Sequence, residues 1–261
     1  MMKNLWMALA FATGLSSTTA TATTPQCSDT IYLGKNYTVC EVDLRKVELE
    51  LFWRDDNGRA HGKFAHLRRK LKSQGIELAF AMNGGMYHKD LSPVGLFVAN
   101  GKELSPLNQD HDHGNFFLKP NGVFYWRGDQ AGILETDAFQ AKKPEPEFAT
   151  QSGPMLVING KLHPAFIKDS PSLRFRNGVG LRSQHQLVFV ISREVVNFHE
   201  FATLFRDEVG CENALYLDGT VSALYAPPAH GIRHRHSFGP ILGITQKQNA
   251  EAEAPAPANS N

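Results

Sequence analysis

The sequence has almost no excess of charge of either sign. Its 261 residues include 27 Lys and Arg and 26 Asp and Glu, which gives a formal net charge of +1 at pH 7. Proteins that bind nucleic acid or dock on anionic membranes usually carry a clear positive excess. The composition therefore predicts neither a nucleic-acid partner nor an anionic membrane surface as a partner.

Long apolar segments are absent after the first 22 residues, so we expect no integral membrane span. Residues 1–22 contain one charge, Lys3, then a short apolar run and the small residues Ala20-Thr21-Ala22. This order is typical of a secretory signal peptide, with a buried N-terminal helix as the alternative. Cleavage after Ala22 would remove Lys3 alone, leaving 26 of the 27 basic residues against 26 acidic ones. We expect an exported protein, periplasmic or secreted, with a neutral mature chain.

Cysteine is scarce, with three residues in the whole chain. In an oxidising compartment two of them can pair. Cys27 and Cys40 flank a short predicted hairpin, although the odd number leaves the pairing open. Cys211 lies between a predicted helix and an apolar strand, which favours a small buried residue over a catalytic thiol.

Several motifs of familiar enzyme classes are also absent. There is no phosphate-binding loop, no dinucleotide fingerprint and no nucleophile elbow, so we predict no nucleotide cofactor. Two histidine-rich stretches, 111–115 and 230–236, leave a metal site open as a rival hypothesis. Both are also typical of exposed loops, and adjacent side chains seldom converge on one ion unaided. We predict no metal and no cofactor.

Turn signals and short apolar runs dominate the remaining chain. Asn-Gly between apolar runs predicts hairpins over 94–104, 115–126 and 154–163. The helical periodicity of apolar residues predicts two amphipathic helices within 62–75 and 197–210. Short apolar runs suited to central strands occur at 77–83, 186–192, 214–218 and 240–246. The sequence predicts an α+β domain with a large, mostly antiparallel sheet.

The domain organisation is expected to be simple. The length suits a single domain over 23–246 after the signal peptide at 1–22. Residues 247–261 lack large apolar side chains, which predicts a disordered tail.

Four separate segments combine special backbone positions with polar side chains. Paired glycines such as Gly84-Gly85 let a ligand approach the backbone, and successive amides can bind an anion. The four segments are Asn83-Gly84-Gly85, Ser152-Gly153-Pro154, Arg174-Phe175-Arg176 and Asp218-Gly219 with Ser222. Each alone is comparably typical of a structural role: a plain turn, a strand entry, an exposed basic edge or an Asx-turn.

In this order the four segments resemble the phosphodiester glycosidase family, which includes the enzyme that uncovers mannose-6-phosphate tags and many exported bacterial proteins. The resemblance extends over roughly 78–243 and includes Arg176 with Gly180 and the run Ala214, Leu215, Leu217, Asp218, Gly219. One departure is Thr220-Val221, where the family has a glycine-rich turn. Thr and Val disfavour positive φ, so the uncovering enzyme's substrate is not transferred to this chain.

The resemblance implies hydrolysis of a sugar-1-phosphodiester at the anomeric C–O bond, with release of the sugar and a phosphomonoester. It implies Asp218 as the carboxylate near the anomeric carbon and Arg176 as the phosphate ligand, assisted by the Gly84 and Gly85 amides. The other substrate-binding residues predicted on this ground are Asn83, Ser152, Gly153, Arg174, Gly219 and Ser222. A second acid stays open among Asp90, Asp169 and Glu194.

The expected partner is a glycan or sugar-phosphate small molecule. The alternative function is a non-catalytic binder of phosphorylated cell-envelope glycans, which could tolerate a neutral residue at position 218. A third class, a structural module of the cell envelope, predicts no small-molecule site.

Overall fold

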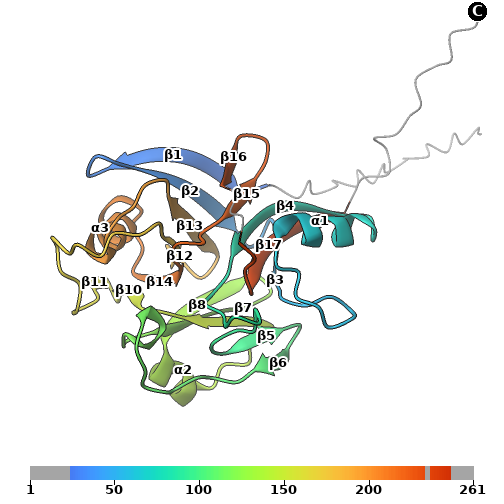
Figure 1. Ribbon diagram of the computed structural model, residues 1–261, viewed down its shortest axis with the longest axis horizontal. Helices are drawn as coiled ribbons and strands as arrows, with labels where there is room; N and C mark the ends of the chain where they lie inside the picture. Colours follow the sequence, from blue (N-terminus) through green and yellow to red (C-terminus); the bar gives the residue numbers. More distant parts are fainter. Residues whose placement is uncertain (1–23, 233–235, 248–261) are drawn as a thin grey trace, which may run out of the picture.

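The computed structural model describes residues 24–232 and 236–247 (Figure 1). The predicted signal peptide lies outside the described residues, as does the predicted tail from residue 248 onward. Gln246 and Lys247 belong to the last strand, so the ordered domain reaches at least one residue into the tail predicted from 247.

Strands greatly outnumber helices in the described chain. The strands are β1 (Gln26–Tyr32), β2 (Lys35–Asp43), β3 (Glu48–Phe52), β4 (Ile76–Asn83), β5 (Phe97–Ala99), β6 (Lys102–Ser105), β7 (Gly122–Arg127), β8 (Gln130–Glu135), β9 (Phe148–Ser152), β10 (Met155–Ile158), β11 (Lys161–Leu162), β12 (Asn177–Leu181), β13 (Gln186–Ser192), β14 (Asn213–Asp218), β15 (Leu224–Ala226), β16 (His230–Ile232) and β17 (Ile241–Lys247). The helices are α1 (Phe64–Lys72), α2 (Thr136–Lys142) and α3 (Phe198–Thr203), with a short 3-10 helix, η1 (Asn115–Phe117), and a π-helical turn, η2 (Leu204–Glu208), that continues α3.

The strands form three antiparallel sheets. A seven-stranded sheet has the order β1-β2-β13-β12-β14-β10-β11, and two five-stranded sheets have the orders β16-β15-β4-β17-β3 and β6-β5-β9-β7-β8. The predicted α+β class with mostly antiparallel pairing is confirmed. The strands are divided among three sheets, however, where the sequence predicted one large sheet.

The three sheets enclose one apolar core, and each helix covers an outer face of one sheet (Figure 1). The central cluster takes buried side chains from all three sheets, including Phe80, Phe124 and Phe189. Leu67 and Leu71 of α1 pack on the outer face of the sheet that contains β4, and Phe201 of α3 packs on the seven-stranded sheet. Phe139 of α2 packs on the third sheet. Helices with one apolar stripe are expected to pack in this way.

Two of the three predicted Asn-Gly hairpins are confirmed. Asn100 and Asn159 both adopt positive φ, at 52° and 48°, in the turns between β5 and β6 and between β10 and β11. The hairpin predicted over 115–126 is wrong, because η1 replaces its first strand. Asn121 is buried there and uses its side chain to bond the Phe116 carbonyl and the Thr136 hydroxyl.

The cysteines follow the interpretation given above. Cys27 and Cys40 form a disulfide that joins β1 to β2 across their hairpin. Cys211 is buried, and burial raises the pKa of its thiol to about 12, which keeps the thiol protonated at neutral pH.

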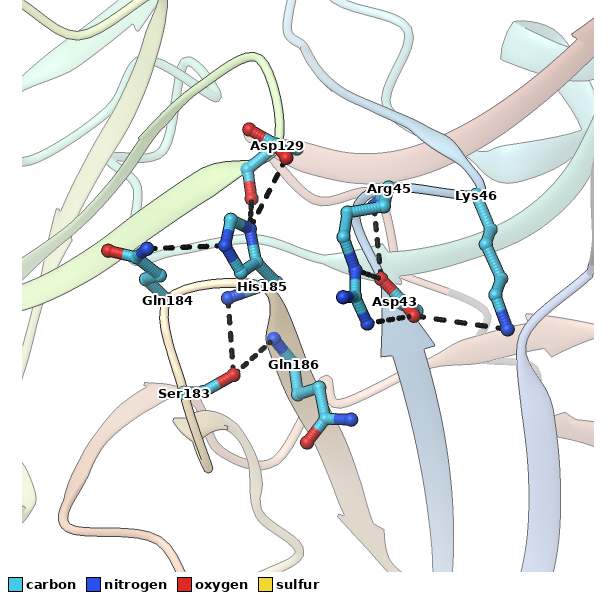
Figure 2. Close-up of polar contacts among 8 residues, drawn as sticks. All are labelled: Asp43, Arg45, Lys46, Asp129, Ser183, Gln184, His185 and Gln186. Atoms are coloured by element: carbon cyan, nitrogen blue, oxygen red, sulfur yellow. Dashed lines mark hydrogen bonds and ion pairs between the residues drawn. The ribbon is translucent and has the colours of Figure 1, made fainter.

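Turns join one end of the seven-stranded sheet to the five-stranded sheet that contains β7 and β8 (Figure 2). The turn after β12 carries His185, whose Nδ1 lies 2.7 Å from the backbone oxygen of Asp129 in the β7–β8 turn. The backbone N–H of Ala131 donates to the Gln184 carbonyl, and Arg45 forms a two-pronged bond to Asp43 nearby. The His185 and Ala131 contacts join the turn at the Leu181 end of β12 to the β7–β8 turn. The opposite end of β12, at Asn177, lies beside Asp218.

Within the described ranges, no helix combines the length and the apolar character needed to cross a bilayer.

Candidate active site

Asp218 is the last residue of β14, and its carboxylate is half-buried among hydrogen-bond donors. Oδ2 accepts a 2.8 Å bond from the Asn83 side-chain amide. Oδ1 accepts a 2.6 Å bond from the backbone N–H of Gly219. The carboxylate is therefore held in one orientation by two donors, one from the end of β4 and one from its own turn.

A network of amides and hydroxyls surrounds this carboxylate. The Asn177 amide donates to the backbone carbonyl of Asn83 at 2.8 Å, and the Ala223 N–H donates to the Asn83 side-chain oxygen at 2.9 Å. The Ser222 hydroxyl lies 2.5 Å from the Gly219 carbonyl and 3.1 Å from the Asp218 carbonyl. These bonds bring together three stretches far apart in the sequence: the end of β4, the start of β12 and the turn after β14.

Burial raises the pKa of Asp218 from 3.8 to about 6, although the bonds from Gly219 and Asn83 oppose the rise. Desolvation disfavours the ionised form, and no neighbouring charge is among the causes of the shift. Asp218 can therefore exchange a proton near neutral pH, as acids and bases in enzymes do.

Gly84 follows Asn83, and Ser152 bonds to Leu217, so both lie next to residues that flank Asp218. The predicted glycines are packed closely against protein. The Gly84 N–H donates to the Pro240 carbonyl at 2.8 Å, so this amide is already occupied. A Cβ on Gly85 would lie 2.7 Å from Thr150 Oγ1, and one on Gly153 would lie 2.5 Å from Asn121 Cβ. The Ser152 hydroxyl donates to the Leu217 carbonyl at 2.9 Å. In the structure these residues hold β4 and β9 against their neighbours, and their contact with a substrate stays a prediction.

Arg176 is fully buried, at 0% exposure, which the sequence reasoning did not anticipate. Its Nε and Nη2 donate to the carbonyls of Val196 and Ser172, both at 2.9 Å, and Nη1 has no hydrogen-bond partner. The guanidinium lies 3.6 Å from the Phe198 ring centroid and 5.4 Å from that of Tyr216. Burial lowers the pKa of Arg176. Direct contact between this guanidinium and a phosphate stays a prediction.

Arg174 does not share the environment of Arg176. Its side chain is exposed, and Nη1 donates to the Leu173 carbonyl at 2.6 Å.

Two residues missing from the predicted site lie beside Asp218 in the structure. Asn177 pairs with Asp218 between β12 and β14, and Tyr216 lies two residues before Asp218 with 1% of its surface exposed. In the sequence Asn177 is followed by Gly178, and Asn-Gly pairs are typical of turns. Tyr216 stands within an apolar strand, which indicated core packing. One signal in the sequence could have pointed to Asn177, because this polar residue directly follows Arg176, a predicted site residue.

The three candidates for a second acid do not contribute to the raised pKa of Asp218. Asp90 accepts bonds from the backbone N–H and hydroxyl of Ser92, and Glu194 is bound by Asn36 and Lys35. Asp169 is exposed.

For a metal, the described residues contain no cluster of three or more His, Cys, Asp or Glu side chains placed to hold an ion. His234, which the metal hypothesis included, lies outside the described residues.

Residues 77–245 match the family described as phosphodiester glycosidase. The chain belongs to this family. A relative in Escherichia coli (strain K12), the uncharacterized protein YigE, is 38% identical over 199 residues, which cover 76% of this chain and 78% of that protein. The predicted membership of the phosphodiester glycosidase family is thus confirmed over the part of the chain that carries Asn83, Arg176 and Asp218.

Solved structures share the fold of this phosphodiester glycosidase domain. The catalytic domain of zebrafish N-acetylglucosamine-1-phosphodiester alpha-N-acetylglucosaminidase, auto-inhibited by its pro-peptide, superposes with a TM-score of 0.57 at 16% identity, over 84% of this chain and 81% of that chain. A hypothetical protein from Synechocystis gives a TM-score of 0.53 at 13% identity, over 85% and 61%. A putative exported protein from Burkholderia pseudomallei K96243 gives 0.51 at 10% identity, over 80% and 74%. At these identities the likeness shows the fold alone.

Proposed function

We propose that this protein is an exported hydrolase that cleaves a sugar-1-phosphodiester at the anomeric C–O bond, releasing the sugar and a phosphomonoester. The observation that carries the proposal is Asp218, a half-buried carboxylate whose pKa is raised to about 6. Family membership supports a hydrolase of the glycosidase type. The catalytic domain of the zebrafish enzyme, whose name describes this bond type, has the same fold.

Asp218 is the proposed carboxylate at the anomeric carbon. Cleavage of a glycosidic bond builds positive charge on the sugar ring, and a fixed carboxylate stabilises that charge or attacks the carbon. A phosphate leaves readily, so the reaction depends less on a strong general acid than ordinary glycoside hydrolysis does. One well-held carboxylate with donors around it is therefore consistent with the reaction.

Export is supported by two independent features of the chain. Residues 1–22 have the charge and apolar order of a signal peptide. The Cys27–Cys40 disulfide fits an oxidising compartment, since such bonds are rare in reducing cytosol. An epitope-tagged full-length chain should fractionate outside the cytoplasm with a mature N-terminus after Ala22. Retention of residues 1–22 in the cytoplasm would refute export.

The test of the reaction is an assay of the mature chain against a panel of sugar-1-phosphodiesters. We expect release of a phosphomonoester, and we expect Asp218→Asn to lower kcat at least about a hundredfold while the protein stays folded. Asp137→Asn is the matched control, because Asp137 is an exposed carboxylate in the first turn of α2. An Asp218→Asn variant with full activity would refute the assignment.

The alternative, a non-catalytic binder of phosphorylated glycans, predicts a different outcome from the same panel. A binder would show saturable association with a panel member, no turnover, and nearly unchanged affinity in Asp218→Asn.

A further inference from the structure

The buried cation of Arg176 has no carboxylate partner. Within the described residues, none of the ion pairs at 4.0 Å or less includes Arg176. Its Nη1 atom makes no hydrogen bond of good geometry, and the Tyr216 hydroxyl is the neighbouring polar group that opposes the fall in its pKa. Glu200 acts on Arg176 only through space, since its carboxylate accepts the Asn197 N–H at 2.9 Å in the cap of α3. Burying a charge without a partner is costly, so a positive field is retained at this position at the expense of stability.

Tyr216 contacts both this cation and the turn that follows Asp218. Its ring centroid is 5.4 Å from the Arg176 guanidinium carbon, and the Phe198 ring meets it edge-on at 4.9 Å. A Cβ added to Gly219 would lie 2.5 Å from the tyrosine hydroxyl, so the hydroxyl is in contact with the residue whose N–H binds Asp218. The phenol oxygen therefore contacts the residue that binds the Asp218 carboxylate, while the ring of Tyr216 packs towards the guanidinium of Arg176.

The phenol keeps its proton in this environment. Burial is the largest cause and raises the pKa of Tyr216 well above its usual value, and the Asp218 charge raises it further. Arg176 and the Asn115 side chain oppose the rise. Because the hydroxyl stays protonated at neutral pH, it can donate a hydrogen bond to an anion.

We propose, on the basis of the function proposed above, that the Tyr216 hydroxyl is a substrate-contacting residue that donates a hydrogen bond to a non-bridging oxygen of the scissile phosphoryl group. Arg176 stands behind it as a positioning residue, whose buried charge makes the space around the hydroxyl attractive to an anion. Both groups are buried, Arg176 at 0% and Tyr216 at 1% exposure. The tyrosine hydroxyl reaches the turn that carries Asp218, whereas the guanidinium is bonded to the carbonyls of Val196 and Ser172. The ligand class is a phosphate monoester or diester of a sugar.

The test measures phosphate binding apart from turnover. Inorganic phosphate is titrated into the whole mature protein and followed by calorimetry, with Tyr216→Phe and the matched variant Tyr125→Phe. Tyr125 is a half-buried tyrosine of β7 that packs on Phe139 of α2, so its loss removes a hydroxyl from another sheet. We expect phosphate to bind roughly 10- to 100-fold more weakly to Tyr216→Phe, as for a lost bond to a charged group, and within about twofold to Tyr125→Phe.

The outcomes separate this inference from the proposed function. If phosphate binding depends on Tyr216 but no sugar-1-phosphodiester is cleaved, the phosphate contact stands and the proposed reaction fails. If the panel is cleaved and Tyr216→Phe matches the wild type in both phosphate affinity and kcat/KM, the contact is refuted. Absence of saturable phosphate binding to the wild type also refutes it.

A measurement on the wild type covers the case in which Tyr216→Phe does not fold. With ring-labelled tyrosine, phosphate should shift the NMR signal of Tyr216 and leave that of Tyr125 in place. Equal or absent shifts at both tyrosines would overturn the proposal.

Discussion

Replacing Asp218 by Asn should change how the stability of the protein depends on pH. The carboxyl has a pKa of 3.8 in the unfolded chain and about 6 in the fold, so the folded state binds the proton more tightly. Between these values the folded state holds more protons than the unfolded one, and stability falls as pH rises. This loss of stability is absent below pH 3.8, where the carboxyl is protonated in both states. It reaches its full size above about pH 6, where the carboxyl is ionised in both states.

The size of the effect follows from the shift. One pKa unit corresponds to 1.36 kcal/mol, so ionised Asp218 costs the folded state about 3 kcal/mol at pH 7.5. Asp218→Asn removes this dependence. Its own loss of one accepted hydrogen bond, from Asn83 or Gly219, does not vary with pH. The difference in unfolding free energy between variant and wild type should therefore move by about 3 kcal/mol in favour of the variant from pH 3.5 to pH 7.5.

Urea unfolding across this pH range measures both proteins directly. The Asp137→Asn control should follow the wild type at every pH, because Asp137 is exposed on α2. Parallel stability curves for wild type and Asp218→Asn would show that the carboxylate is not held in a desolvated site, and the reasoning about Asp218 would be wrong.

Three further predictions concern the surroundings of this carboxylate and the fold. Gly219→Ala should lower the unfolding free energy by about 1–3 kcal/mol, because its Cβ meets the neighbouring phenol at 2.5 Å, whereas Gly231→Ala, with 3.7 Å to its nearest neighbour, should be close to neutral in the same denaturation assay. Reduction of the Cys27–Cys40 bond, separated by 13 residues, should cost about 3 kcal/mol in urea unfolding with and without reductant, and an unchanged midpoint would contradict it. Asn83→Asp places a second carboxylate 2.8 Å from that of Asp218. Repulsion between the two charges raises the pKa of Asp218, so the acidic limb of the pH profile of kcat/KM should move to higher pH. An unmoved limb would show that it does not report the ionisation of Asp218.

Local patterns predicted the strands well where one physical signal dominated. The apolar runs of β4, β13 and β14 were identified as central strands, and they are buried at the middle of their sheets. Asn159-Gly160 was identified as a turn, and positive φ at both residues is what that turn requires. The division of the strands into three sheets was not visible, since it depends on long-range pairing.

Local sequence patterns gave wrong predictions where a side chain packs against residues far away in the sequence. Asn121-Gly122 has the letters of a turn, but Gly122 is needed because its Cβ would meet the Leu134 carbonyl at 2.8 Å across the sheet. Arg176 alternates with Arg174 in a pattern typical of an exposed basic edge. Its burial results from Phe198 and Tyr216, which follow 22 and 40 residues later and enclose the guanidinium.

Part of the spatial arrangement around Asp218 was predicted, and the functional roles of the site residues stay predictions. The order of Asn83, Arg176 and Asp218 led to the family, and the structure places Asn83 in direct contact with Asp218. The packing roles of Gly84, Gly85 and Ser152 depend on strands elsewhere in the chain, so no local pattern could separate those roles from ligand binding.

The position of bond cleavage tests the proposed reaction most directly. Hydrolysis of a sugar-1-phosphodiester is carried out in water enriched in oxygen-18, and both products are analysed by mass spectrometry. If Asp218 acts at the anomeric carbon, the label enters the sugar and the phosphomonoester stays unlabelled. Label in the phosphate would show cleavage of the P–O bond and would contradict the account.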